Sequence, residues 1–524
     1  MSGRLKNFYT ENKSLSWLGI INFILVYVST FTPGYGYFID EFYYIACSNH
    51  PAWGYVDQPP LAPILLFVYK LIFGTSVYSI RILPAIAFSL TIIFTGLIVK
   101  QYGGNKSAQF LSALCLMCSP VYSAMSGFYS MNAFEPLIAV IVFYLLLKMV
   151  KYDNPKHWTV MGILFGLALM NKHTAGVYIA FIPIALLLTA QRKILFNYRF
   201  ILCVIISFFI FLPDILWNVF NGYPTIEFYK NITLYKNVPT PPLQFSLNQF
   251  QNYSPFVVLF GIAGAFYLIF GKELKKFRFA GYIFILVYLF FMLTKTSRID
   301  RLAFIYPLVI PAGAILFVNA TNKNYLRKLK YAVYFLLFAW FCLIIPLLNP
   351  YLSYEKTDSL ASFLGLNTEL EKGNKPLIPQ TLADRIGWEE KVGMIEKVYK
   401  SINDTLSGDK NGKIAIFAEN YGMAGAIELY GKEKLNNPDV ICAHNNYYFW
   451  SMEELKKISP RYILAITHPS SYDNFKKSFD EVDSTGMIFD NKYCTPHERN
   501  LTIFICSKPK KTPLELFENT KFFY

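Results

Sequence analysis

The chain has 524 residues, of which 54% are hydrophobic, 18% are aromatic and only 16% are charged, whereas soluble domains carry about 25% charged residues. This composition excludes an ordinary soluble globular protein and predicts a polytopic membrane protein. The net charge of +15 does not indicate nucleic-acid binding, because the lysines and arginines form short clusters between apolar runs and no continuous basic face.

The first apolar segment, residues 15–32, follows three basic residues, Arg4, Lys6 and Lys13. It is about as long as a membrane span needs to be, and it has no small-residue cleavage site. We therefore expect an uncleaved first transmembrane helix with a cytoplasmic N-terminus.

An acidic, aromatic-rich stretch follows at residues 33–66, and we expect it to be a loop that carries Asp40, Glu41 and Asp57. Carboxylates at the edge of a membrane are costly unless water, a cation or a reaction offsets their desolvation. The stretch therefore predicts an active site at the bilayer face. Its aromatic residues predict either a stacking platform for sugar or polyprenyl groups or an interfacial belt: Tyr35, Tyr37, Tyr43, Tyr44, Trp53 and Tyr55.

Ten further apolar segments predict membrane spans. They lie at 81–99, 107–124, 133–149, 157–170, 174–190, 200–219, 255–270, 279–293, 302–319 and 331–348. The apolar run at 61–73 is shorter, in the range typical of re-entrant or interfacial helices, so we expect that it does not cross.

Loop charges favour this arrangement, because nearly every basic cluster then falls in a cytoplasmic loop. These clusters are Lys100 and Lys106; Lys148, Lys151 and Lys156; Arg192, Lys193 and Arg199; Lys272, Lys275, Lys276 and Arg278; and Lys323, Arg327, Lys328 and Lys330. The exception is KTSRIDR at 295–301, which joins the acidic stretch on the outer side. The same side receives Glu135, the NKH of 171–173, Asp214 and the loop 221–254. This convergence indicates a functional site, although ion pairs that stabilise helix ends would give the same pattern.

About eleven spans place residues 349–524 on the outer side as well. The runs KIAIFA at 413, RYILAI at 461 and LTIFIC at 501 alternate with helical stretches such as GMAGAIELY, which predicts a small α/β domain. We therefore expect a transmembrane catalytic domain of residues 1–348 and an extracytoplasmic α/β domain of residues 349–524.

No metal or cofactor is expected. The eight cysteines show no framework spacing, and none of the six histidines has a metal-ligand spacing. Cys115 and Cys118 form a C-x-x-C, but they lie in an apolar run without a second pair, which favours helix core over a metal or redox site.

An outward-facing site has no supply of nucleotide sugars, whereas lipid-linked sugars are presented there. The phosphate of such a donor is already a good leaving group, so the protein has to supply a cation for the phosphate and a base for the acceptor hydroxyl. The candidate catalytic residues are Asp40, as the base, and the adjacent Glu41. The candidate phosphate-binding residues are Lys172, His173, Arg298 and Arg301. The candidate acceptor- or substrate-binding residues are Asp57, Gln58, Glu135 and Tyr43.

Several motifs resemble a known family in order along the chain. IDEFYYIA, YVDQPPLAPIL, GFYSMNAFEPL, GLALMNKHTAGVY, LPDILWNVFNGYPTIEF and RLAFIYPLVIPAGA resemble the membrane half of bacterial family 39 glycosyltransferases. These enzymes are relatives of the protein O-mannosyltransferases and of the lipid A aminoarabinose transferase. ADRIGWEEKV, AENYGMAGAIELYG, AHNNYYFW and YCTPHERN resemble the tail of one subgroup.

The resemblance implies a mainly α, polytopic GT-C fold with about eleven to thirteen transmembrane helices. It also implies a polyprenyl-phosphate-linked sugar donor and a base in the first outer loop, which carries over onto Asp40. Two positions depart from the pattern. The aminoarabinose-transferase branch has a lysine where this chain has Gln58, which moves the expected phosphate contacts to Lys172 and the 295–301 loop. Many relatives have an acidic residue where this chain has Asn132, with Glu135 one turn later.

We therefore expect a glycosyltransferase of the cell inner membrane, surrounded by membrane lipids, that moves a sugar from a polyprenyl-phosphate donor to a glycolipid, polysaccharide or protein. Two alternatives stay open. A transporter or flippase of lipid-linked saccharides predicts polar residues at mid-bilayer and related halves. A non-catalytic envelope glycan-binding protein would use AHNNYYFW as its sugar platform.

Overall fold

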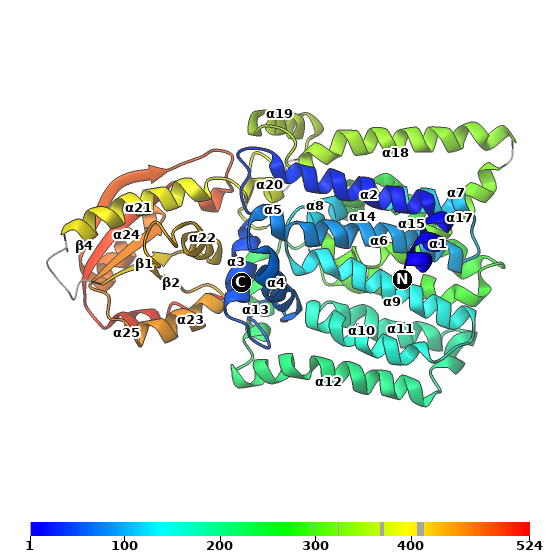
Figure 1. Ribbon diagram of the computed structural model, residues 1–524, viewed down its shortest axis with the longest axis horizontal. Helices are drawn as coiled ribbons and strands as arrows, with labels where there is room; N and C mark the ends of the chain where they lie inside the picture. Colours follow the sequence, from blue (N-terminus) through cyan, green and yellow to red (C-terminus); the bar gives the residue numbers. More distant parts are fainter. Residues whose placement is uncertain (1, 297, 323, 367–370, 406–412) are drawn as a thin grey trace.

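The computed structural model describes residues 2–296, 298–322, 324–366, 371–405 and 413–524. Ser297 of the basic 295–301 loop and Lys323 of the last basic cluster therefore lie outside the described residues. A bundle of apolar helices forms one end of the molecule and a sheet flanked by helices forms the other (Figure 1). Residues 349–524 are called the C-terminal region below.

Each of the eleven apolar segments predicted as spans is helical. The bundle contains α1 (Ser2–Glu11), α2 (Lys13–Val28), η1 (Ser29–Phe31), α6 (Ile82–Gln101), α7 (Lys106–Met117), α8 (Pro120–Ser126), α9 (Met131–Lys151), α10 (His157–Asn171), α11 (Ala175–Leu187), η2 (Ala190–Ile194), α12 (Tyr198–Phe220), α15 (Pro255–Phe270), η4 (Lys275–Phe277), α16 (Arg278–Leu293), η5 (Ile299–Leu302), α17 (Tyr306–Thr321), η6 (Asn324–Leu326) and α18 (Arg327–Leu348).

Six helical stretches among the described residues are long and apolar enough to cross a membrane. They are Lys13–Phe31, Val77–Gln101, Met131–Lys151, Tyr198–Phe220, Lys275–Leu293 and Arg327–Leu348. Two bent pairs, Lys106–Met117 with Pro120–Ser126 and Pro242–Tyr253 with Pro255–Phe270, raise this number to eight. Prolines begin the second helix of each pair, where the chain bends by 64° and 117°. The other expected spans are the shorter apolar helices α10, α11 and α17. The chain is thus a membrane protein.

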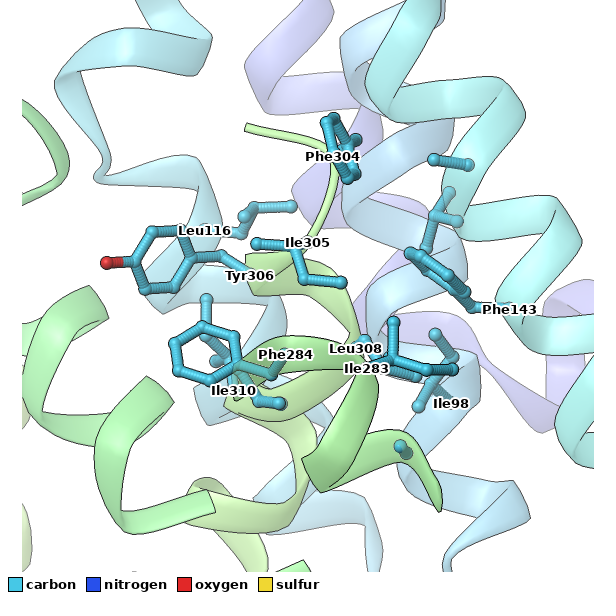
Figure 2. Close-up of a cluster of buried hydrophobic side chains, with 14 of the residues drawn as sticks. Ile98, Leu116, Phe143, Ile283, Phe284, Phe304, Ile305, Tyr306, Leu308 and Ile310 are labelled. Carbon is cyan, nitrogen blue, oxygen red and sulfur yellow. The ribbon is translucent and has the colours of Figure 1, made fainter. Parts of the chain in front are cut away.

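The centre of the bundle is a continuous apolar core. Residues around the start of α17 pack against α6, α7, α9 and α16 through side chains such as Phe304, Leu308, Phe143 and Phe284 (Figure 2). Helices α15 and α17 touch through their backbones, since a Cβ on Gly264 would lie 2.0 Å from the carbonyl oxygen of Val309. Only glycine fits such a contact.

Short helices lie where the bundle meets the C-terminal region (Figure 1). They are α3 (Ile39–Asn49), α4 (Leu61–Phe73), α5 (Val77–Ile80) and α13 (Pro224–Asn231). The π-helix η3 (Ile232–Lys236) continues α13, and α14 (Pro242–Tyr253) packs into the bundle core through Phe245 and Tyr253. The expectation that the acidic stretch is a loop was therefore wrong for residues 39–49. Helix α3 forms because the Glu41 side chain accepts a hydrogen bond from the Phe38 backbone N–H at 2.8 Å, and because two acidic residues in its first turn favour the positive helix N-terminus.

The C-terminal region contains a five-stranded sheet of order β2-β1-β3-β5-β4. Strand β1 pairs in parallel with β2 and β3, whereas β5 pairs antiparallel to β3 and β4. The strands are β1 (Ile414–Ala418), β2 (Asp439–Cys442), β3 (Tyr462–Thr467), β4 (Phe479–Phe489) and β5 (Leu501–Pro509). The helices are α19 (Tyr354–Leu364), α20 (Gln380–Ala383), α21 (Trp388–Thr405), α22 (Tyr421–Tyr430), α23 (Asn446–Leu455), η7 (Pro469–Ser471), α24 (Tyr472–Ser478), η8 (Pro496–Glu498) and α25 (Pro513–Phe517). The three runs predicted as strands are confirmed as β1, β3 and β5.

Candidate functional site

Asp40 lies in the first turn of α3 and is partly exposed. Its Oδ1 accepts a hydrogen bond from the hydroxyl of Tyr421, at 2.8 Å, which comes from the C-terminal region. Burial raises the pKa of Asp40, while the Tyr421 hydrogen bond and the positive charges of Lys236 and Arg298 oppose this increase. The carboxylate therefore combines the raised basicity of a desolvated group with nearby cations.

Glu41, the next residue, has a different environment from that expected of a catalytic group. It is 0% exposed and forms an ion pair with Arg81 at 2.7 Å, whose side chain is 2% exposed. Its two oxygens also accept hydrogen bonds from the backbone N–H groups of Phe38 and Tyr129. A carboxylate held by four hydrogen bonds ties α3 to α6 and to the start of α9, and it has no free oxygen directed at a substrate.

Asp57 lies close to Asp40, and a tyrosine links it to α3. The Tyr43 hydroxyl donates to Oδ1 of Asp57 at 2.8 Å. Burial raises the pKa of Asp57 to about 7, and the negative charge of Asp40 contributes to the increase. The neighbouring Gln58 is buried behind α3, where its Nε2 lies 3.8 Å from the Sγ of Cys47.

The aromatic residues of this stretch are mostly part of the core. Trp53 is 60% exposed, whereas the other five predicted platform residues are buried. Tyr43 packs against Tyr421 with ring centroids 4.8 Å apart. Protein therefore covers the faces of these five rings.

Lys172 and Glu135 form a buried ion pair beside the 295–301 loop. The Lys172 Nζ lies 2.8 Å from Oε2 of Glu135 and 3.7 Å from Oδ2 of Asp300. Thr174 donates to the other Glu135 oxygen at 2.6 Å. Lys172 follows the last residue of α10 and Glu135 lies in the first turns of α9, so the ends of two helices are joined here.

Arg298 contacts two carboxylates. Its Nε lies 3.3 Å from Oδ1 of Asp300, and its Nη1 lies 3.3 Å from Oε1 of Glu371, which Lys236 also contacts at 3.3 Å. Burial alone would raise the pKa of Asp300, but the positive charges around it, with Arg298 the strongest, lower that pKa to about 2. Asp300 is therefore an anion at every physiological pH.

The two remaining basic candidates differ in their partners. The Nε2 of His173 lies 3.0 Å from Oδ2 of Asp214, and its Nδ1 lies 3.3 Å from the hydroxyl of Tyr229. Within the described part of the chain, the Arg301 guanidinium forms no hydrogen bond or ion pair. Burial lowers the pKa of Arg301, and the negative charges of Asp300 and Glu135 oppose this decrease. Arg301 is thus the cation of this group that is most available to an anionic ligand.

Sequence reasoning missed several residues of this site. Glu371 and Tyr421 come from the C-terminal region, more than 300 positions from Asp40 in the sequence, and only the resemblance quoted the motif that contains Tyr421. Lys236 lies in the π-helix η3, a feature that often marks functional sites. Asp300 lies in the KTSRIDR loop, but only Arg298 and Arg301 of that loop were predicted to belong to the site.

Further contacts close this part of the molecule. Residues 521–524 pack against α13 and α23: Lys521 pairs with Glu227 at 2.7 Å, and the Phe523 carbonyl accepts from Asn231 at 3.1 Å.

A surface cavity of about 550 Å³ lies elsewhere, between α21 and β4. Among the described residues, no cluster of three or more His, Cys, Asp or Glu side chains has a geometry that could hold a metal ion.

Comparisons with known proteins match different parts of the chain. The dolichyl-phosphate-mannose-protein mannosyltransferase family matches residues 57–217, a range that begins at Asp57 and excludes Asp40 and the C-terminal region. The undecaprenyl phosphate-alpha-4-amino-4-deoxy-L-arabinose arabinosyl transferase of Pseudomonas savastanoi pv. phaseolicola is 24% identical over 121 residues. That alignment spans 22% of this chain and 23% of the curated relative.

Solved structures match nearly the whole fold. ArnT from Cupriavidus metallidurans bound to undecaprenyl phosphate has a TM-score of 0.59 at 12% identity, covering 93% of this chain and 97% of that chain. The oligosaccharyltransferase of Archaeoglobus fulgidus has a TM-score of 0.50 at 13% identity, covering 87% of this chain and 70% of that chain. The predicted fold class is thereby confirmed. The chain therefore shares the GT-C fold of these two solved structures.

Proposed function

We propose that the protein is an integral-membrane glycosyltransferase that transfers a sugar from a polyprenyl-phosphate donor to a hydroxyl group of a glycan, lipid or protein. The fold and the names of its relatives, which are transferases, support this function. One solved relative of the same fold is bound to undecaprenyl phosphate, the kind of lipid carrier that such a donor contains.

The observation that carries the proposal is the environment of Asp40. A partly exposed carboxylate is held by Tyr421 in a setting where burial raises its pKa, and Arg298 and Lys236 are close enough to act on that pKa. Such a group can remove a proton, and the cations can bind a phosphate. Among the predicted site residues, Asp40 combines partial exposure, a single fixed oxygen and neighbouring cations.

In the proposed reaction, the acceptor hydroxyl transfers its proton to Asp40 as its oxygen bonds to the anomeric carbon of the sugar. The bond between that carbon and the phosphate oxygen breaks, and its electron pair leaves with the polyprenyl phosphate. Arg301 and Arg298 interact with the phosphate, and Lys172, held by Glu135 and Asp300, contributes positive charge behind them. Asp57, which lies close enough to Asp40 for the two charges to interact, contacts the acceptor.

We assign supporting roles to the remaining candidates. Glu41 fixes the orientation of α3 through Arg81, and His173 fixes α12 through Asp214. Glu135 orients Lys172. Gln58 and Tyr43 hold the residues around Asp57, since both are buried.

We also propose that the protein lies in the inner cell membrane. In this orientation the transmembrane domain of residues 1–348 places Asp40 at the extracytoplasmic face, and residues 349–524 form an extracytoplasmic domain. The positions of the basic clusters in the opposite loops support this orientation.

The proposed activity can be tested without knowing the acceptor, because undecaprenyl phosphate is released whichever acceptor is used. Membranes with the protein would be incubated with a panel of undecaprenyl-phosphate sugars and envelope extract, and release would be followed by mass spectrometry. We expect Asp40→Asn to lower release by about 10²- to 10⁴-fold. Asp153→Asn is the matched control, since this exposed carboxylate pairs with Lys276 beyond the far end of α9, and it should keep full activity. Normal turnover by Asp40→Asn would refute the role of Asp40.

A further inference from the structure

Helix α22 of the C-terminal region lies directly on α3. A Cβ added to Gly422 would meet the side chain of Ile39 at 2.3 Å, and one added to Gly425 would lie 3.0 Å from the backbone of Phe42. Two glycines one turn apart therefore let the backbones of the two helices approach. This contact reaches the two residues that flank Asp40 and Glu41, so the C-terminal region packs on the helix that carries the proposed base.

The start of α22 is fixed by a buried polar network. Asn420 caps the helix by accepting from the Met423 N–H at 3.0 Å, and its Nδ2 donates to Oε1 of Glu498 at 2.7 Å. Glu498 in turn pairs at 2.5 Å with Lys391, whose side chain is 0% exposed. A buried network of this kind holds its members in one geometry, and the next residue after Asn420 is Tyr421.

Two other rings also pack against the Tyr421 ring. Its centroid lies 4.8 Å from that of Tyr43 and 4.6 Å from that of His444. His444 is buried, and its Nε2 lies 2.6 Å from the backbone oxygen of Tyr524. With its ring and its backbone both fixed, the Tyr421 hydroxyl reaches Oδ1 of Asp40 at 2.8 Å.

We propose that Tyr421 is a positioning residue for the transfer reaction: the C-terminal region supplies it to hold Oδ1 of Asp40, which leaves Oδ2 to accept the proton of the acceptor hydroxyl. This inference rests on the proposed role of Asp40 as the base. It makes the C-terminal region part of the catalytic machinery and not only a binding platform.

The hydrogen bond has a measurable consequence, because a donor to the ionised form of an acid lowers its pKa. In the wild-type protein the Tyr421 hydroxyl opposes the effect of burial on Asp40. Losing it should raise the pKa of Asp40 and shift the acid limb of the kcat profile to higher pH. The other titratable or charged groups that act on Asp40, or on which it acts, are Lys236, Arg298, Glu371, Asp57, Asp384 and Tyr44, and all of them are unchanged in a Tyr421 variant.

The test compares Tyr421→Phe with Tyr447→Phe in the full-length protein, with undecaprenyl-phosphate release measured from pH 5 to pH 9. Tyr447 is a matched control, since it lies in the same region and its hydroxyl donates at 2.8 Å to a carboxylate oxygen of Glu428 and not of Asp40. We expect Tyr421→Phe to move the acid limb upward by about one pH unit, and to lower kcat below that limb about tenfold. Tyr447→Phe should leave the limb where it is in the wild type.

A second variant keeps both the ring and the hydroxyl. Replacing Tyr421 by 3-fluorotyrosine makes the hydroxyl a stronger donor, so the limb should move to lower pH, opposite to the effect of Tyr421→Phe. A limb that stays in place in both variants, or a uniform loss of activity at every pH, would overturn the positioning role. If Asp40→Asn remains active, the proposed function fails. If Asp40→Asn is inactive and both Tyr421 variants have the wild-type limb, only the present inference fails.

Discussion

Replacing the carboxylate by an amide should have different effects at the adjacent residues Asp40 and Glu41. We expect Glu41→Gln to lower stability, whereas Asp40→Asn should lower activity and leave stability unchanged. Glu41→Gln keeps the size of the side chain but removes the charge that compensates Arg81, and both groups are almost fully buried. It also replaces one acceptor oxygen by an amide NH2 group, which would face the N–H donors of Arg81 and of the backbone. Burial and the nearby positive charge of Arg81 already lower the pKa of Arg385 to about 9, so the substitution leaves two buried guanidinium groups with less compensation.

Breaking a buried ion pair by removing one partner costs on the order of 3–5 kcal/mol. For a chain of this length we expect Glu41→Gln to lower the melting temperature in detergent by roughly 5 °C. Asp40→Asn is the internal control, because its Oδ1 can still accept from Tyr421, and its melting temperature should stay near that of the wild type. A Glu41→Gln protein with wild-type melting and no turnover would refute this reasoning and give Glu41 the catalytic role first expected of it.

Three other outcomes can be checked independently. The pKa of Asp57, about 7, lies above its ordinary value of 3.8, so the folded state holds this proton more tightly than the unfolded state does. Stability should therefore fall as the pH rises from about 4 to 7, by at most about 4 kcal/mol, and Asp57→Asn should flatten this fall in melting scans. Gly425→Val places a Cβ 2.8 Å from a side chain of α3, so it should cost about 1–3 kcal/mol in the same scans, whereas unchanged melting would contradict the close packing of α22. In a Cys342→Ser background, which removes the one exposed cysteine of the described chain, Trp53→Cys and Lys275→Cys should react with impermeant thiol reagents from opposite sides of the membrane; labelling from one side would refute the topology.

The bundle could be predicted from the sequence because long apolar runs have few alternatives in a membrane. All eleven predicted segments are helical, and the strands β1, β3 and β5 follow runs of β-branched and aromatic residues. Helix α3 was missed because residues 42–47 form one short continuous apolar run, from which periodicity alone does not identify a helix. Its first turn is also held by the contact between Glu41 and Arg81, 40 residues apart, and no local pattern contains that contact.

The candidate site was harder to predict than the fold, because residue type does not reveal a partner. Lys172 and Arg298 were identified as cations, but Glu135, Asp300 and Glu371 occupy their hydrogen-bonding groups. The acidic partners come from three separate segments of the chain. Membership in the site could thus be inferred from charge, whereas the roles depend on tertiary contacts.

The charges of the site also bear on how the proposed reaction would be accelerated. A sugar donor of this type is a phosphodiester with one negative charge, whereas the released polyprenyl phosphate is a monoester with up to two. Only a contact that strengthens as this charge develops lowers the barrier. Lys172 and Arg298 are already paired with carboxylates, so their attraction to the leaving phosphate increases less as its negative charge develops. Arg301, which has no such contact within the described chain, is the cation whose interaction grows most as the phosphate leaves.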